Sequence, residues 1–263
     1  MSHKIEVPQS GCRLVGEVGG HGTDVVLIHG EGMDRRMYDL QVAPLQDAGC
    51  RVLAMDMRGH GESRPAVAVP EATPESDVLA MMDDVGMDSA VLVGQSLGGN
   101  VCQSLARNNS DRVRALVIID SAWNREQLTP LDRLSLWIST PLLRISPWPW
   151  LVGHMARASA VTPEGVALAR RSFSQLSKGE FLHAWELAKS ALSTQNDGTP
   201  NLPLLLICGE KDSTGKILRS MRTWADETGV PLYIVPGAGH LSNVDRPDFV
   251  NQVLLDFLAQ FHE

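Results

Sequence analysis

The sequence lacks the features that mark secreted, disulfide-bonded or membrane-spanning proteins. No run approaches the ~18 consecutive apolar residues of a membrane helix, and the first 20 residues hold no apolar core of signal-peptide length. Cysteines are few and show no C-x-x-C spacing, which indicates reduced, buried thiols. The four lie at Cys12, Cys50, Cys102 and Cys208. We therefore expect a cytoplasmic protein.

Basic residues are also scarce relative to acidic ones. Lys and Arg total 23 against 31 Asp and Glu, giving a formal charge of −8, and no block of basic residues occurs. Such a chain is a poor match for nucleic acid or an anionic membrane, so we expect a small-molecule substrate as its partner. Its 43% hydrophobic and 21% charged residues exclude a disordered chain. The sequence leaves the oligomeric state open, with a homodimer as one option.

Short apolar runs alternate with helical patterns along most of the 263 residues. The runs are continuous, as expected for strands covered on both faces. They span 24–28, 51–55, 90–93, 115–119, 204–207 and 231–235, and helical patterns span 35–48, 74–85, 97–108, 217–228 and 247–261. This alternation predicts an α/β fold: a mostly parallel twisted sheet with helices on both faces. Cys12–Val18 alternates in polarity instead and is expected to be an antiparallel edge strand.

Residues 123–201 depart from this alternation. They show no convincing strand, three helical patterns near 128–139, 163–176 and 179–193, and a Pro-rich turn at Ser146–Trp150. We expect them to form a helical lid inserted into a core made of 1–122 and 202–263.

The expected lid holds five of the six tryptophans. A small helical unit cannot bury five indoles within itself, because its own core is small. We therefore expect Trp148, Trp150 or Trp185 to line a substrate pocket, which would then be largely apolar.

The clearest chemical signal is Gly94-Gln95-Ser96-Leu97-Gly98, a G-x-S-x-G between a predicted strand and a predicted helix. The sharp turn strains the serine and leaves no room for side chains at 94 and 98, which explains the two glycines. A serine hydroxyl is a weak nucleophile without a base. His240 follows the last predicted strand by five residues. It therefore belongs at the end of the sheet where ligands bind and is the expected base.

The expected base needs an acid that fixes its tautomer. Asp212 follows the predicted strand at 204–207 and gives the chain order Ser, Asp, His. Asp120, at the end of the strand at 115–119, is the alternative acid, and Glu210 is a less favoured third.

The negative charge that develops on a substrate carbonyl needs hydrogen-bond donors. The glycines of His29-Gly30-Glu31-Gly32 would let backbone N–H groups approach a carbonyl closely. The expected donors are the N–H groups of Glu31 and Leu97, with the Glu31 side chain pointing away. No His, Cys or carboxylate cluster has metal-ligand spacing, so neither a metal nor an organic cofactor is expected.

Over nearly its whole length the chain resembles α/β-hydrolase-fold proteins. His29-Gly30 resembles the oxyanion loop of that family, and the segment Asp56–Ser63, DMRGHGES, resembles its D-x-R-G-x-G-x-S. The resemblance implies that Ser96, Asp212 and His240 form a catalytic triad and that 123–201 is the lid. Gln95 departs from the His or Tyr often found before the nucleophile.

The resemblance also narrows the function. A serine nucleophile argues against haloalkane dehalogenases and epoxide hydrolases, which use Asp. The chain is most similar to carboxylesterases, enol-lactone hydrolases and perhydrolase-like members, which implies cleavage of an ester, thioester or lactone through an acyl-enzyme. The alternatives are a carbon–carbon bond hydrolase of a diketone, a non-hydrolytic small-molecule receptor and a cofactor-free oxygenase.

Overall fold

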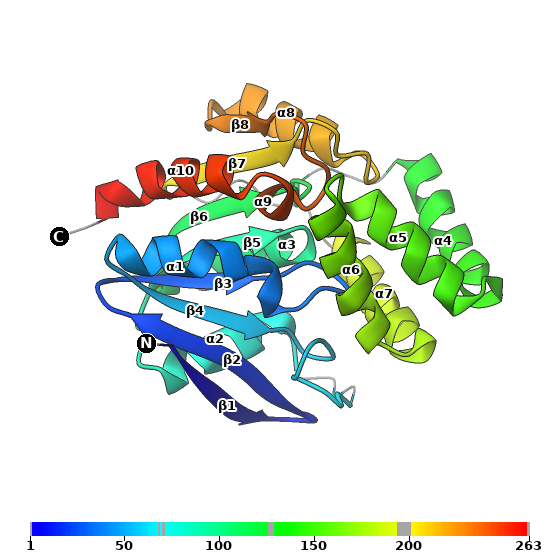
Figure 1. Ribbon diagram of the computed structural model, residues 1–263, viewed down its shortest axis with the longest axis horizontal. Helices are drawn as coiled ribbons and strands as arrows, with labels where there is room; N and C mark the ends of the chain where they lie inside the picture. The colour runs from blue at the N-terminus through cyan, green and yellow to red at the C-terminus, as the bar shows by residue number, and fades with distance from the viewer. Residues whose placement is uncertain (1, 68, 70–71, 126–128, 194–200, 262–263) are drawn as a thin grey trace.

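A twisted sheet runs through the middle of the molecule (Figure 1). The computed structural model describes residues 2–261, except 68, 70–71, 126–128 and 194–200. The strands are β1 His3–Gln9, β2 Cys12–Gly20, β3 Thr23–Ile28, β4 Cys50–Asp56, β5 Ala90–Gln95, β6 Val113–Ile119, β7 Leu204–Gly209 and β8 Leu232–Val235. Their order across the sheet is β1-β2-β4-β3-β5-β6-β7-β8. Strands β3 to β8 are parallel, which confirms the mostly parallel sheet.

One edge of the sheet differs from the expectation. The predicted strand at Cys12–Val18 exists within β2 and is antiparallel, but its expected place at the edge is wrong. β1 pairs antiparallel with β2, His3 opposite Val18, and occupies that edge. Its apolar residues are Ile5 and Val7, of which Val7 alone is buried, so the apolar pattern of β1 is too short to predict a strand.

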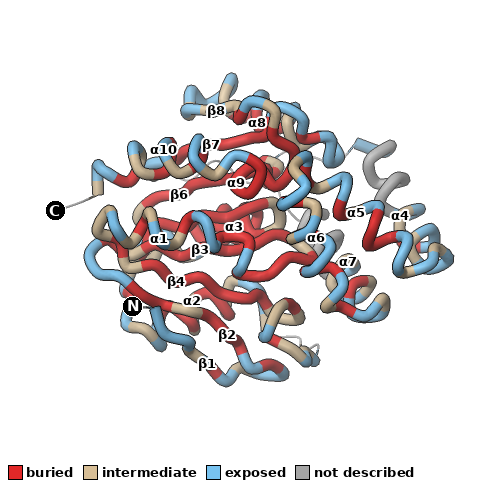
Figure 2. Tube along the Cα trace, viewed as in Figure 1, coloured by how far each residue is buried: buried red, intermediate tan, exposed pale blue. Residues whose placement is uncertain are grey.

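Helices cover both faces of the sheet. Outside the helical insertion they are η1 Arg35–Tyr38, α1 Asp39–Asp47, α2 Pro74–Asp84, α3 Leu97–Asn108, η2 Ser110–Arg112, α8 Ile217–Thr228, α9 Ser242–Asp245, α10 Pro247–Leu258 and η3 Ala259–Phe261. Successive strand residues pack into two separate cores, because side chains alternate between the faces of a strand. One core joins the strands to α1 and α10, and the other joins them to α2, α3 and α8. Figure 2 shows the buried strands between these layers.

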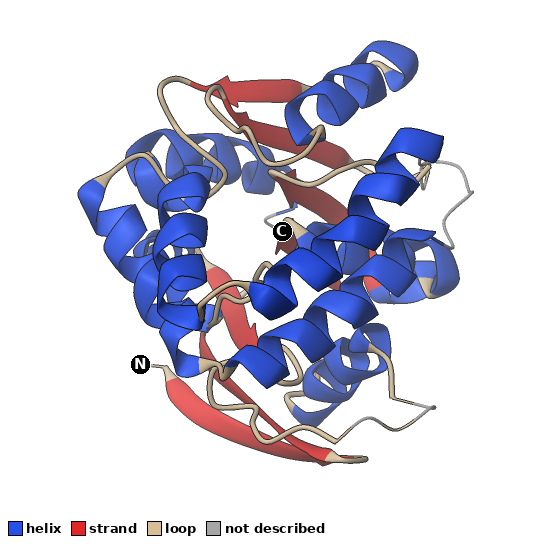
Figure 3. Ribbon diagram, turned by 90° about the vertical axis from the view of Figure 1, so that its right-hand side faces the viewer, coloured by secondary structure: helices blue, strands red, loops and turns tan. Residues whose placement is uncertain are grey.

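Four further helices lie together beyond the arrowheads of β4 and β7 (Figures 1 and 3). They are α4 Pro130–Ile145, α5 Trp148–Ser159, α6 Pro163–Gln175 and α7 Lys178–Ser193. The sequence did not predict α5: the expected turn at Ser146–Trp150 ends early, and Trp148 begins the helix with Pro149 in its first turn. Proline is compatible with that position because the first N–H groups of a helix need no partner within it.

The boundary of the expected lid at residue 123 stays a prediction. Trp123 itself packs in the core of the sheet, stacked on Trp224 of α8 with ring centroids 5.5 Å apart. Among the described residues, no helix is both long and apolar enough to cross a membrane.

Asp56 anchors the loop that follows β4. Its carboxylate is fully buried and accepts hydrogen bonds from the backbone N–H of Arg35 at 2.7 Å and of Glu62 at 2.8 Å. The Arg35 guanidinium donates a third at 2.5 Å.

We expect Asp56→Ala to lower the free energy of unfolding by about 3–5 kcal/mol, because it leaves buried donors without an acceptor. The control is Glu6→Ala, which removes an exposed ion pair with Arg13 and is expected to cost less than about 1 kcal/mol. Urea unfolding of both variants measures the two costs. Similar losses would show that the Asp56 cluster does not stabilise the fold.

Candidate active site

Ser96 lies at the turn between β5 and α3 with φ 51° and ψ −119°, in the left-handed region that side chains rarely adopt. A Cβ built on Gly94 would lie 2.4 Å from the carbonyl oxygen of Gly98. One on Gly98 would lie 2.2 Å from the carbonyl oxygen of Ile28 at the end of β3. Both positions therefore require glycine, as the sequence motif predicts.

His240 connects the serine to a carboxylate. Its Nε2 lies 3.0 Å from the Ser96 hydroxyl, and its Nδ1 lies 2.9 Å from Oδ2 of Asp212. The backbone N–H of Thr214 donates to the other Asp212 oxygen at 2.8 Å. Asp212 thus makes the contact with His240 that the sequence predicts for the acid.

His240 is protonated more readily than an imidazole free in water. Burial opposes the charged form, but the hydrogen bond and negative charge of Asp212 outweigh it and raise the pKa of His240 above its usual 6.5. In the neutral form Nδ1–H donates to Asp212, which leaves Nε2 to accept the Ser96 proton.

Asp120, the alternative acid, has a different set of partners. It is fully buried, with φ 45°, and accepts hydrogen bonds from the backbone N–H of Gly209 at 2.7 Å and of Ser242 at 3.0 Å. It therefore ties the end of β7 to the loop that carries His240. Burial raises the pKa of Asp120 to about 7, and the charge of Asp212 adds to the rise.

Two further side chains hold the His240 loop. Gln95, the residue before Ser96, donates to the carbonyl oxygen of His240 at 2.7 Å. Asp245 accepts from the backbone N–H of Gly239 at 2.8 Å and of Thr162, at the start of α6, at 2.9 Å. The sequence alone assigned neither residue to the His240 loop. The signal that could have pointed to Gln95 is its replacement of the His or Tyr often found before the nucleophile.

The loop after β3 lies against the nucleophile. A Cβ on Gly30 would be 3.1 Å from that of Ser96. The backbone N–H groups of Glu31 and Leu97, the expected oxyanion donors, have no hydrogen-bond acceptor among the described residues. The Glu31 carboxylate instead lies 3.3 Å from Nε2 of His60. Both predicted donors thus have free N–H groups beside the serine turn.

His29 fixes the start of this loop. Its Nε2 accepts from the backbone N–H of Met57 at 2.9 Å, and its Nδ1 lies 2.7 Å from the carbonyl oxygen of Gly30. Complete burial, with the nearby His60, lowers the pKa of His29 to about 3, so the ring is neutral.

The tryptophans expected in the pocket make contacts within the insertion. Trp148 donates to the carbonyl oxygen of Leu176, and Trp185 donates to the Ser139 hydroxyl. Trp150 is half exposed and stacks on His154. None of these contacts involves Ser96 or His240, and lining of a pocket by these rings stays a prediction.

One group of described residues could bring metal-ligand atoms together: the ligand atoms of Asp120, Cys208 and Asp212 lie within 4.8 Å of one another. The four carboxylate oxygens already accept hydrogen bonds, from three backbone N–H groups and from the ring of His240. Burial raises the pKa of the Cys208 thiol well above its usual range. A neutral thiol and carboxylates surrounded by N–H donors fit a cation poorly.

A model of the alpha/beta hydrolase family matches residues 25–253. The chain belongs to this family. One relative is the dihydrolipoyllysine-residue acetyltransferase component of an acetoin cleaving system from Cupriavidus necator. The two sequences are 26% identical over 259 residues, which cover 92% of this chain and 65% of that protein. It is 25% identical to a 2-hydroxy-6-oxononadienedioate/2-hydroxy-6-oxononatrienedioate hydrolase of Klebsiella pneumoniae, with 98% of this chain and 96% of that protein covered.

Solved structures agree with the family assignment. A thermophilic esterase from Thermogutta terrifontis superposes with a TM-score of 0.81 at 25% identity, covering 99% of this chain and 100% of the other. An enol-lactonase from Burkholderia xenovorans superposes with a TM-score of 0.80 at 23% identity, covering 97% and 100%. The family, with these relatives, supports a hydrolase of the α/β fold.

Asp120 makes stability depend on pH. Its pKa of about 7 in the folded state exceeds the 3.8 of a free carboxyl, so between these values the folded protein binds more protons than the unfolded one. The contribution of Asp120 to stability therefore falls as pH rises from about 4 to 7. Asn does not ionise, so Asp120→Asn is expected to remove this fall, at most about 1.4 kcal/mol per pH unit. Urea unfolding of wild type and variant at intervals across this range measures it; parallel pH curves would contradict the assignment.

Proposed function

We propose that the protein is a serine hydrolase that cleaves an ester, thioester or lactone of a small, largely apolar substrate through an acyl-enzyme. The observation that carries this proposal is the unbroken hydrogen-bond chain from Ser96 through His240 to Asp212. The free backbone N–H groups of Glu31 and Leu97 lie at the Ser96 end of this chain of hydrogen bonds. A nucleophile, a base, an acid and oxyanion donors are the parts that acyl transfer requires.

The proposed reaction has two halves. Nε2 of His240 accepts the Ser96 proton while Oγ bonds to the substrate carbonyl carbon, and Asp212 stabilises the imidazolium. The N–H groups of Glu31 and Leu97 donate to the oxyanion. As it collapses, the bond to the leaving group breaks and His240 supplies that group with a proton. Water, deprotonated by His240, then attacks the acyl-enzyme, and Ser96 recovers its proton. No step needs a metal or an organic cofactor.

The similar proteins support two different kinds of substrate. The esterase and enol-lactonase folds are consistent with a carboxylic ester or lactone. The Klebsiella pneumoniae relative, with near-complete coverage, is the reason to retain a carbon–carbon bond hydrolase as the second candidate. Both reactions begin from a serine and a histidine, so the substrate has to be found by assay.

We expect Ser96→Ala to lower the turnover of p-nitrophenyl esters by roughly 10³–10⁶-fold, because the triad acts as a unit. Ser104→Ala, on the same helix α3 but outside the triad, is the control and should retain activity. The panel should run from acetate to octanoate and include a phenyl ester, lactones and a vinylogous diketone.

The panel separates the candidates. Cleavage of esters or lactones that rises with acyl length supports the proposal. Turnover confined to the diketone would favour carbon–carbon cleavage, and Ser96→Ala that keeps more than about a tenth of the activity would exclude the proposed nucleophile.

The pKa of His240 should appear in the pH dependence. The base must be neutral, so we expect kcat/KM to rise with pH to a plateau, with a midpoint above the ordinary 6.5 because Asp212 raises that pKa. Asp212→Asn removes the charge and should move the midpoint to lower pH while reducing the plateau by about 10⁴-fold. Rate profiles of both proteins test this. If the midpoint is the same in Asp212→Asn as in the wild type, the titrating group is not His240.

A further inference from the structure

A groove on the surface of the insertion lies between α5 and α6, outside the site described above. Its volume is about 720 Å³, within the range of small-molecule pockets. The groove is lined by Arg157, Val161, Pro163, Val166, Ala167, Arg170, Arg171 and Ser174. None of these residues belongs to the triad or to the loop after β3.

Most of the groove-lining residues of α6 lie on the side opposite its buried residues, although Val166 is half-buried and also packs against the core. Residues 163, 166, 167, 170 and 174 follow helical spacing along the side of the groove. Ala169, Ser172 and Phe173 face inward and are buried, and Phe173 packs against Gly32. A ligand in the groove would therefore contact the outer side of α6, away from the nucleophile.

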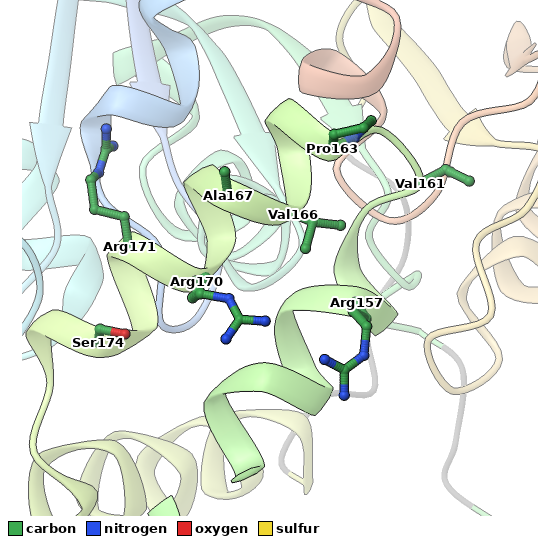
Figure 4. Close-up of a pocket in the computed structure, with 8 residues that line it drawn as sticks. All are labelled: Arg157, Val161, Pro163, Val166, Ala167, Arg170, Arg171 and Ser174. Carbon is green, nitrogen blue, oxygen red and sulfur yellow. The ribbon is translucent and has the colours of Figure 1, made fainter. Parts of the chain in front are cut away.

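Two arginines point toward each other across this groove (Figure 4). A Cβ built on Gly153 of α5 would lie 3.5 Å from Nη1 of Arg157 and 3.6 Å from Nη1 and Nη2 of Arg170. Both guanidinium groups thus reach the same point. Arg171, by contrast, points away and pairs with Asp34 at 3.6 Å.

Arg157 and Arg170 are unpaired positive charges. Neither forms a hydrogen bond or an ion pair with any described residue, and no acidic side chain lines the groove. The chain as a whole carries a formal charge of −8, yet no carboxylate lines this groove. Two like charges this close repel each other, and a bound anion would relieve the repulsion.

Apart from Arg171 and Ser174, the other lining residues are apolar. Val166 lies beside the two arginines, and Val161 and Pro163 continue from it toward one end of the groove (Figure 4). A bare inorganic anion would leave this surface uncovered, and an uncharged lipid would leave the guanidinium groups unpaired. Charge and apolar surface together match a carboxylate that carries an acyl chain.

We propose that this groove binds an amphipathic carboxylate, a medium-chain acyl anion. The carboxylate bridges the guanidinium groups of Arg157 and Arg170, and the chain covers Val166, Val161 and Pro163. The site does not depend on the proposed hydrolase reaction, because no triad residue takes part in it.

Octanoate is the probe, and isothermal titration calorimetry of the full chain measures its dissociation constant. We expect binding of octanoate and at least about tenfold weaker binding of both acetate, which lacks the chain, and octan-1-ol, which lacks the charge. The double variant Arg157→Gln with Arg170→Gln should bind octanoate at least about tenfold more weakly. Arg219→Gln, at an exposed arginine on α8, is the matched control and should bind as wild type does.

A second variant keeps both arginines. Ala167 is exposed and one helical turn before Arg170, so Ala167→Glu supplies a competing carboxylate without disturbing the helix. It should weaken octanoate binding as the double variant does.

Three results would overturn the proposal. Octanoate binding that survives the double variant would place the ligand elsewhere, and equal affinity for acetate would make the site an anion site only. The third result is that the wild-type protein does not bind free octanoate but cosediments with anionic phospholipid vesicles, and the double variant does not cosediment. That result would assign the surface to a membrane.

Discussion

The left-handed backbone of Ser96 is the constraint on which the site depends. A serine at φ 51° is strained, and its neighbours hold it there. Its N–H donates to the carbonyl oxygen of Ile119 at 3.0 Å, and its own carbonyl accepts from the Ser121 hydroxyl at 2.6 Å. Gly98, in the first turn of α3, lies so close to the end of β3 that no side chain would fit there. The parallel sheet thus fixes the nucleophile where the loop after β8 can reach it.

The remainder of the site is held by buried polar side chains rather than by secondary structure. His240 lies in a loop, and Gln95, Asp120 and Asp245 each bond to the backbone of that loop. Buried polar groups with satisfied hydrogen bonds specify one geometry, because every alternative leaves a donor or an acceptor without a partner. Asp245 also bonds to the start of α6, so one carboxylate joins the base to the insertion. The loop that carries His240 and the helices of the insertion are therefore held together by shared hydrogen bonds.

The fold could be predicted from sequence where one physical signal dominated. Strands buried on both faces appear as continuous apolar runs, and G-x-S-x-G located the serine turn with its glycines. β1 was not predicted, because an exposed edge strand needs little apolar pattern. The helix α5 was not predicted, because Pro149 in its first turn is also typical of a turn. The sequence favours Asp212 over Asp120 only through the order Ser, Asp, His along the chain. Both follow parallel strands, and only the folded backbone shows which one faces the imidazole and which one faces N–H groups.

The most direct test of the central claim is covalent labelling with a fluorophosphonate, followed by peptide mapping by mass spectrometry. The account predicts a single adduct on Ser96 in the wild-type protein. Because the hydroxyl depends on its base, labelling should be largely lost in His240→Ala. An adduct on another residue, or equal labelling of Ser96 without His240, would contradict the account.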